Sequence, residues 1–371
     1  MNVLVISTVD FNRHGIPISV MNTYSKFSHD SIQYTFVTNK SIDHNFAKII
    51  SQNHDEYYVL PDRKKQTLLY ISKLFEVMGK KEYQIVHIHT NSRTCCIELL
   101  VAVFCRINTR IVHSHSASCE HRIIHKFLGG LFKLLYTHGV ACSEEAGKHM
   151  FSHDSFTVIN NGIDVELFKY NGEIRFLLRK ELSIDDNALV IGHVGLFNEG
   201  KNQSFLVDVF YEFLKEVPNS YLVFIGSGPL ECDVKEKVIN LGIQKKILFL
   251  GEKSNTYDYY NVFDVFCFPS LYEGLGIVMI EAQANGLPCI ASTGVPKKTD
   301  FSETTRYIEL EVECWCDALL KVNNIDREKA SRINKQHIIE RGFSNVTTAK
   351  VINELYLKER GVLCGEKYQE K

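Results

Sequence analysis

Short, unbroken runs of apolar residues recur along the chain, and they limit its possible folds more than any other feature. The first run, residues 2–8 (NVLVIST), does not alternate with charged residues. Such runs are typical of strands that are buried on both faces, as in a parallel sheet covered by helices. Similar runs follow in the first half of the chain, at residues 33–39, 56–60, 85–90, 110–115 and 139–143.

Stretches with a helical period separate these runs, for example residues 68–81 and 94–105. Alternation of strands and helices is the signature of a doubly wound α/β domain. Residues 160–172 (NNGIDVELFKYNG) interrupt the alternation, because they are rich in Asn and Gly and have no helical period. We interpret them as a domain boundary.

A second alternating series follows this boundary. It predicts strands at 189–195, 221–228, 247–252, 264–270 and 288–292, and helices at 206–217, 234–242, 277–286 and 345–360. A chain of 371 residues is long enough for two domains. We therefore predict an α/β fold of two Rossmann-like domains. The domains are residues 1–165 and 166–345, and a C-terminal helix in residues 346–371 returns to the N-terminal domain.

Composition and charge exclude several classes of protein. Hydrophobic residues make up 45% and charged residues 23%, which is an ordinary globular balance. A net charge of -2 argues against a partner nucleic acid. No apolar run approaches the roughly 20 residues that span a bilayer, and the start lacks the pattern of a signal peptide. The 11 cysteines show no zinc-binding spacing, so we expect mostly buried thiols in a reducing cytoplasm.

The segment 269–288 (PSLYEGLGIVMIEAQANGLP) gives the clearest indication of a binding site in the sequence. A strand ends just before it, Gly274 and Gly276 follow in a loop, and a helix then begins. The glycines let the backbone come close to a ligand. The N–H groups of Leu275, Gly276 and Ile277 would point out of the helix N-terminus, which makes an anion site suited to a phosphate or diphosphate.

Two carboxylates flank that turn, Glu273 before the helix and Glu281 one turn into it. Carboxylates accept hydrogen bonds from vicinal hydroxyls, so the pair suits a ribose and a hexose. A sugar nucleotide offers hexose, diphosphate and ribose in sequence. Taken singly, Glu273 could be a helix cap and Glu281 a solvated helix residue, but their combination with the two glycines favours a binding site.

The same segment closely resembles the E-x7-E signature of the retaining GT-B glycosyltransferases, a family that includes bacterial polysaccharide and capsule enzymes. Further stretches resemble the family in the same order: 158–168 (VINNGIDVELF), 193–202 (HVGLFNEGKN), 224–230 (FIGSGPL) and 262–274 (VFDVFCFPSLYEG). Each stretch is weak alone, but their order and spacing together are specific. The resemblance implies a GT-B architecture, in which the two Rossmann-like domains face a central cleft.

The resemblance also implies roles for particular residues. Glu281 would bind the ribose, Glu273 would lie beside the donor hexose, and the turn at 274–277 would hold the distal phosphate. Lys201 would reach the diphosphate as a point charge. Gly15 corresponds to a glycine loop that approaches the donor phosphates and the acceptor. The nucleobase would lie near residues 251–255.

One position departs from the family pattern. An arginine usually follows the glycine that matches Gly195, and Leu196 stands there instead. A guanidinium is therefore missing from the expected diphosphate site. Either Arg13, Lys297 or Lys298 replaces it, or the donor binds weakly.

Histidines cluster at the ends of two predicted strands. His113 best matches the family's active-site histidine, and His115 and Arg13 are reserve candidates on the acceptor side. We expect His113 and His115 to face opposite sides of the sheet, with one structural, and we interpret His87 and His89 as packing residues. No H-E-x-x-H spacing accompanies the cluster, so we predict no metal site.

Residues 121–135 (HRIIHKFLGGLFKLL) form a basic amphipathic stretch. Such a helix either lies on an anionic bilayer or packs its apolar face into the core as an ordinary surface helix. Lipid-linked acceptors are common in the family that the chain resembles, and this favours the bilayer.

These observations predict a cytoplasmic, metal-independent, retaining hexosyltransferase that is at most peripheral to the inner leaflet of a membrane. Its donor would be a UDP- or GDP-linked sugar, its acceptor a glycan that is lipid-linked, and it would need no cofactor. Two other interpretations stay open: a sugar-nucleotide epimerase of the same fold, and a non-catalytic partner subunit, which would explain Leu196.

Overall fold

The computed structural model describes residues 1–12, 15–29, 31–119 and 122–359. The chain divides into two compact units. The first is Met1–Gly162 together with the chain from Gly342 onward, and the second is Ile163–Arg341. The chain thus passes between the units a few residues before each of the two boundaries expected from the sequence.

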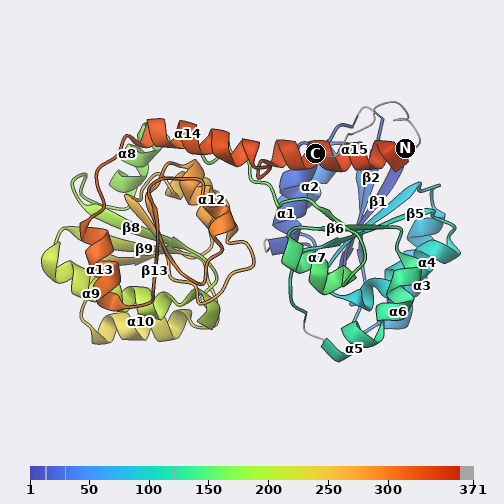
Figure 1. Cartoon of the computed structure of the whole chain (residues 1–371), viewed down its shortest axis with the longest axis horizontal. Helices are drawn as coiled ribbons and strands as arrows, with labels where there is room; N and C mark the ends of the chain where they lie inside the picture. The colour runs from blue at the N-terminus through green and yellow to red at the C-terminus, as the bar shows by residue number, and fades with distance from the viewer. Residues whose placement is uncertain (13–14, 30, 120–121, 360–371) are drawn as a thin grey trace. The chain divides into compact units, whose positions relative to one another are not determined.

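Within its described residues, the first unit is built on a seven-stranded sheet of order β3-β2-β1-β4-β5-β6-β7. Every neighbouring pair is parallel. The strands are β1 (Asn2–Ser7), β2 (Gln33–Asn39), β3 (Glu56–Leu60), β4 (Ile85–Thr90), β5 (Thr109–Ser114), β6 (His138–Ala141) and β7 (Thr157–Val158). Helices cover both faces of this sheet (Figure 1). They are α1 (Gly15–Tyr24), α2 (His44–Gln52), α3 (Thr67–Gly79), α4 (Cys96–Phe104), α5 (Arg122–Phe127), α6 (Gly129–Leu135), α7 (Glu144–Phe151) and α15 (Asn345–Glu359), with a 3-10 turn at Arg93–Cys95.

The last helix, α15, packs on the first unit, as predicted. Ile352 and Tyr356 are buried among core residues of β1, β2 and α1. The Tyr34 hydroxyl donates to Oδ1 of Asn353 at 3.3 Å, and the Tyr356 hydroxyl lies 2.5 Å from Nδ1 of His87. Segments more than 260 positions apart in the sequence are therefore joined in one core.

The second unit, residues 163–341, is described throughout and holds a six-stranded parallel sheet of order β10-β9-β8-β11-β12-β13. Its strands are β8 (Leu189–Val194), β9 (Ser220–Ile225), β10 (Ile247–Phe249), β11 (Val265–Phe268), β12 (Cys289–Ser292) and β13 (Thr305–Ile308). Its helices are α8 (Gly172–Glu181), α9 (Gln203–Glu216), α10 (Glu231–Asn240), α11 (Thr256–Tyr259), α12 (Ile277–Ala284), α13 (Val312–Leu320) and α14 (Arg327–Glu340), with 3-10 turns at Glu199–Lys201, Gln244–Lys246 and Lys297–Thr299.

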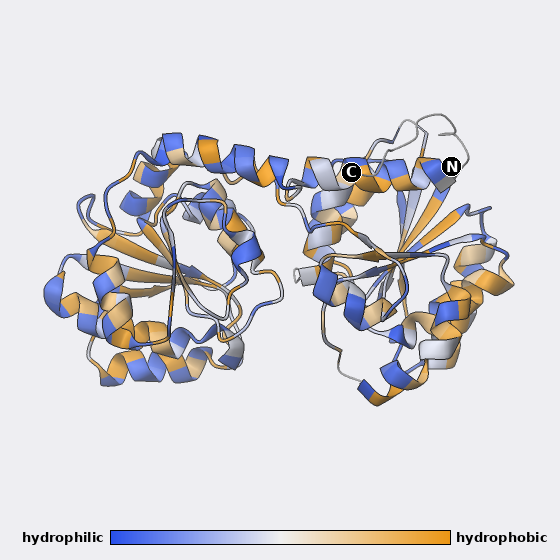
Figure 2. Cartoon of the chain, in the orientation of Figure 1, coloured by the Kyte–Doolittle hydropathy of each residue, from blue (hydrophilic) through white to orange (hydrophobic). Residues whose placement is uncertain are grey.

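Hydropathy explains this layering. The strands are mostly apolar along their length, while many helices carry one apolar and one polar face (Figure 2). β4 is buried at all six positions, and β11 at all four. The prediction of an α/β fold with two parallel-sheet, Rossmann-like domains is confirmed.

The amphipathic stretch differs from the single helix that the sequence indicated. Its described part forms two short helices, α5 and α6, separated by Leu128. His125, Phe132 and Leu135 are the buried residues of the two helices, whereas most of the other apolar side chains point outward.

The thiols are less buried than expected. None of the ten cysteines in the described part of the chain forms a disulfide, and five of them are buried. Cys232 and Cys314 are exposed.

Candidate active site

The turn between β11 and α12 is shaped by Gly276. This residue caps the helix in the left-handed conformation, with φ 75° and ψ 53°. A Cβ there would lie 3.1 Å from the ring of Phe268, so only glycine fits without a shift of its neighbours. The N–H of Met279 donates to the carbonyl of Gly276 at 2.9 Å, whereas the N–H groups of Ile277 and Val278, at the start of α12, have no acceptor within the helix and can bind an anion.

Lys201 and Glu273, 72 residues apart in the sequence, meet beside this turn. The Nζ of Lys201 forms an ion pair with the Glu273 carboxylate and lies 4.8 Å from the centre of the Phe268 ring. The Lys201 backbone is positioned by Asn198, whose side-chain Oδ1 accepts its N–H at 3.0 Å. An anion that reaches Lys201 therefore competes with Glu273 for the same ammonium group.

A buried histidine that sequence reasoning missed supports the loop after β8. His193 is fully buried; its Nδ1 lies 2.9 Å from the carbonyl of Cys267, and its Nε2 3.3 Å from Nε2 of Gln203. Burial lowers the pKa of His193 to about 4, so the ring is neutral near pH 7. Gln203 also donates to the carbonyl of Leu196 at 3.0 Å, which ties the loop to α9. In the sequence, the HVG pattern at residues 193–195 could have pointed to His193.

The loop after β9 packs directly on the loop after β8. A Cβ at Gly226, where φ is 131°, would lie 2.1 Å from the carbonyl oxygen of Gly195. The N–H of Phe197 donates to the carbonyl of Ser227 at 2.8 Å. The Ser227 hydroxyl in turn donates to Glu252, within the stretch expected near a nucleobase. Because β9, β8 and β11 are neighbours, their carboxyl ends bring these loops and the α12 turn to one edge of the sheet.

Leu196 does not fill a packed position, since 52% of it is exposed. Of the residues considered as substitutes for the missing arginine, Lys297 lies with its Nζ 5.7 Å from the centre of the Tyr307 ring. The carbonyl of Lys298 accepts from Arg341 at 2.6 Å. Arg13 lies outside the described residues.

Glu281 has a partner that the sequence did not indicate. The hydroxyl of Tyr260, a fully buried residue, donates to the carboxylate of Glu281 at 2.7 Å. Desolvation raises the pKa of Glu281 to about 7, and the hydrogen bond from Tyr260 opposes part of that rise. The carboxyl group therefore changes charge near neutral pH.

Gly15 and the histidines belong to the first unit. Gly15 begins α1, with open space where a Cβ would stand. His113 is only 3% exposed, while His115 is half-buried. Their ring centres lie 4.2 Å apart and are stacked. The expectation that they face opposite sides was wrong, because residues two positions apart on a strand share a face.

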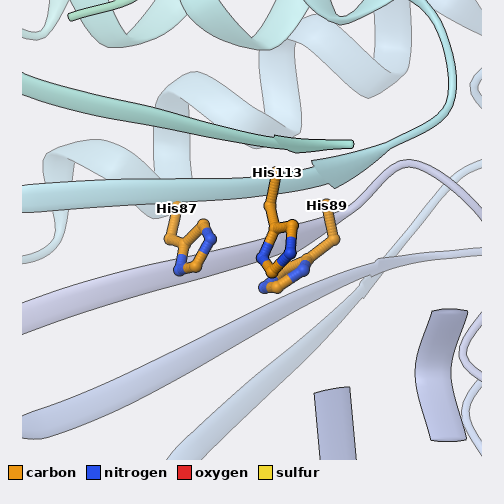
Figure 3. Close-up of side chains that lie close together, drawn as sticks. All are labelled: His87, His89 and His113. Atoms are coloured by element: carbon orange, nitrogen blue, oxygen red, sulfur yellow. The ribbon is translucent and has the colours of Figure 1, made fainter. Parts of the chain in front are cut away.

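His87 and His89 join the same group. The rings of His87 and His89 are stacked 4.3 Å apart, and those of His87 and His113 5.4 Å apart (Figure 3). Burial lowers the pKa of all four histidines, to about 3 for His87 and about 4 for His115.

In the part of the chain that the structure describes, no helix has the length and apolar character needed to cross a membrane.

Comparison with known proteins fits this geometry. Residues 175–300 match the family described as Glycosyl transferases group 1, a range that includes Lys201, Glu273, the α12 turn and Glu281. The protein EpsF of Bacillus subtilis (strain 168), named as a glycosyltransferase, is 29% identical over 348 residues, covering 90% of each chain. The Escherichia coli UDP-Gal:alpha-D-GlcNAc-diphosphoundecaprenol alpha-1,3-galactosyltransferase is 27% identical over 306 residues, covering 76% of this chain and 78% of its own length.

The structure of Anabaena Alr3699/HepE in complex with UDP and glucose has the same fold. Its TM-score is 0.77 at 18% identity, and the superposition covers 96% of this chain and 100% of that chain. The chain is therefore similar to group 1 glycosyltransferases over residues 175–300, and its two parallel-sheet, Rossmann-like units have the fold of GT-B glycosyltransferase structures.

Proposed function

We propose that this chain is a retaining hexosyltransferase that uses a UDP- or GDP-linked sugar and no further cofactor. One observation carries the proposal: Lys201, the glycine turn before α12 and the carboxyl group of Glu281 come from one unit and one run of neighbouring elements. This combination offers a cation, free N–H groups and a hydroxyl acceptor, which are the groups that a nucleotide sugar needs.

In the proposed complex, the donor diphosphate lies at the α12 turn. The N–H groups there and Lys201 stabilise the negative charge that grows on the leaving diphosphate. Glu273 holds the Lys201 ammonium in place before the donor arrives and then turns toward the hexose. Because protein groups neutralise the phosphates, this chemistry needs no divalent cation at the donor site.

The transfer itself breaks the bond between the anomeric carbon and the phosphate oxygen. A hydroxyl of the acceptor forms the new bond on the same face, and its proton passes to the leaving phosphate. Because His113 is almost completely buried, we assign the contact with the reacting sugar to the reserve candidate His115, which is half-buried.

We propose a glycan acceptor carried on a lipid, in the synthesis of a bacterial polysaccharide or capsule. The name of the E. coli relative states a diphosphoundecaprenol acceptor, which supports this class. A surface on α5 and α6 supports it independently. Large apolar side chains there are exposed, with Ile123 at 85% and Phe127 at 88%. We call this surface the α5–α6 patch; it consists of Ile123, Ile124, Phe127, Leu131 and Leu134, beside the exposed cations Arg122 and Lys126.

The proposal is tested by a thermal-shift screen of UDP- and GDP-sugars, followed by mass analysis of products formed with lipid-linked acceptors. Transfer with retained anomeric configuration supports it. Conversion of the donor to an epimer without any acceptor would instead identify an epimerase. Absence of donor binding in calorimetry would identify a non-catalytic partner subunit.

Donor affinity should depend on pH through Glu281. Ribose hydroxyls donate to the ionised carboxylate, so binding favours the charged form and releases a proton wherever the free carboxyl group is protonated. With a pKa of about 7, affinity should fall about tenfold from pH 8 to pH 6. Calorimetry with a nucleotide sugar, whose diphosphate diester does not titrate in this range, measures the change.

Glu281→Gln should bind the donor more weakly, by about 1.5–3 kcal/mol at pH 8, and should lose the pH dependence. Glu313→Gln, at an exposed glutamate on α13, is the matched control and should behave like the wild type. A pH profile that is the same in the wild type and in Glu281→Gln would remove Glu281 from the site.

Leu196→Arg should tighten donor binding about tenfold or more, because a charged hydrogen bond to phosphate contributes roughly 1.5–3 kcal/mol. The exposed leucine leaves room for the longer side chain. Turnover should rise less than affinity, since contacts made equally before and during reaction do not raise kcat. Leu196→Gln controls for polarity without charge. A loss of affinity in Leu196→Arg at an unchanged melting temperature would contradict the proposed diphosphate position.

The α5–α6 patch should bind bilayers that contain anionic lipid. In a vesicle sedimentation assay with phosphatidylglycerol, Ile123→Ser/Phe127→Ser should lose most binding, because burying each side chain is worth roughly 1.5–3 kcal/mol. The double variant Phe176→Ser/Leu177→Ser removes two exposed apolar side chains from α8 and should bind like the wild type. Equal sedimentation of all three proteins would show that the patch does not contact lipid.

A further inference from the structure

Four imidazole rings gather on one face of β4 and β5. His87 and His89 come from β4, His113 from β5, and His115 follows β5 directly. One ring nitrogen each of His87, His89 and His113 can be chosen so that the three lie within 4.8 Å of one another. Figure 3 shows these three side chains pointing into the same space from neighbouring strands.

The contacts of two rings leave the same nitrogen available on each. Nδ1 of His87 lies 2.5 Å from the Tyr356 hydroxyl, and Nδ1 of His89 lies 2.8 Å from Nε2 of His115. If both Nδ1 atoms carry the proton and donate it, the lone pairs of both Nε2 atoms are free. A ligating histidine in a metal site has this arrangement, in which a second residue holds the other nitrogen and orients the ring.

Several nitrogens in the group have no partner. Among the described residues, none forms a hydrogen bond with Nε2 of His87 or with either ring nitrogen of His113. Both residues are almost completely buried. A buried polar atom without a hydrogen-bond partner destabilises the folded state by about 1–3 kcal/mol. Two neighbouring rings with such atoms therefore indicate that a ligand is bound between them.

A small cavity adjoins these atoms. It offers about 10 Å³ to the centre of a water-sized sphere, which is enough for one water molecule or one metal ion. Its lining includes all four histidines and Tyr356.

We propose that His87, His89 and His113 bind a single transition-metal dication, with Zn²⁺ the best match, and that a water molecule completes the shell. Three neutral imidazoles are a preferred ligand set for this class of ion. Ligand nitrogens lie about 2.0–2.1 Å from zinc, so the rings need to close in slightly around the ion. No carboxylate belongs to this set of three residues, which disfavours Mg²⁺ and Ca²⁺.

The ion would have a structural role. It would join β4 to β5 and, through the contact of His87 with Tyr356, help to hold α15 on the first unit. This inference goes beyond the proposed function and does not depend on it. The proposed diphosphate contacts of Lys201 and α12 lie in the second unit and involve no metal.

A second group in the same unit, Cys119, His125 and His149, is a weaker candidate. Both ring nitrogens of His125 already have partners, the N–H of Arg93 at 3.3 Å and the carbonyl of His149 at 3.2 Å. We therefore do not propose a metal site there, and a variant of His125 can serve as the control.

The test begins with the full-length wild type. After incubation with zinc and gel filtration, elemental analysis should find one zinc per chain. X-ray absorption should show a first shell of about four light atoms near 2.0 Å, with the outer-shell pattern of three imidazoles. Cobalt(II) exchanged into the protein should give the intense visible bands of a four-coordinate ion. Zinc below one-tenth per chain, or a six-coordinate cobalt spectrum, would overturn the proposal.

Variants then assign the ligands. His113→Gln should lose the stoichiometric zinc, and Tyr356→Phe should bind it about 10–100-fold more weakly, as loss of an orienting partner does. His125→Gln should retain one zinc per chain. Zinc at full stoichiometry in His113→Gln would refute the site, as would its loss only in His125→Gln. Where a variant fails to fold, refolding the wild type with and without zinc decides: zinc should raise its melting temperature, and an unchanged value would count against the proposal.

Discussion

Parallel strand pairing is the constraint on which the rest of this structure depends. Parallel neighbours require a crossover, and the crossover helices cover both faces of the sheet. The strands must then be apolar on both sides, as β4 and β11 are. The same geometry sends all carboxyl ends of the strands to one edge, where the loops after β8, β9 and β11 meet. The candidate donor site follows from this edge rather than from any single motif.

Close packing of these loops depends on glycine. Gly226 presses on the Gly195 backbone, and Gly276 turns in the left-handed region beneath the Phe268 ring. A side chain at either position would push the loops apart or close the space before α12. The loops that carry Lys201 and Glu273 are joined directly, since the N–H of Leu271 donates to the carbonyl of Gly200 at 2.8 Å.

Burial sets the chemistry of both units, with opposite effects on acids and bases. Desolvation raises the pKa of Glu281 toward neutrality and lowers the pKa of the clustered histidines, since it disfavours the charged form in each case. Glu281 thereby becomes responsive near pH 7, while the histidines stay neutral. Neutral imidazole is the form that ligates metals.

The sequence by itself determined the fold class and much of the strand pattern, because strands that are buried on both faces consist of unbroken apolar runs. Residues 33–39, 56–60 and 85–90 are strands with the predicted ends. It also singled out Lys201, Glu273 and Glu281, through a family pattern that depends on local spacing. It missed α8, because the charged sequence of this helix gives little apolar signal. In the structure the buried residue of α8 is Arg179, whose guanidinium donates to the carbonyl of Val262 and to Asp264.

Only the tertiary structure decided which side chains touch across the sheet. It paired Tyr260 with Glu281, Tyr356 with His87 and Lys201 with Glu273, contacts between residues 21 to 269 positions apart. It also brought four histidines from two strands onto one face. Strand order and register bring these residues into contact. The periodicity of one segment cannot predict such contacts, because it shows which side of the segment is buried but not which other segment packs against that side.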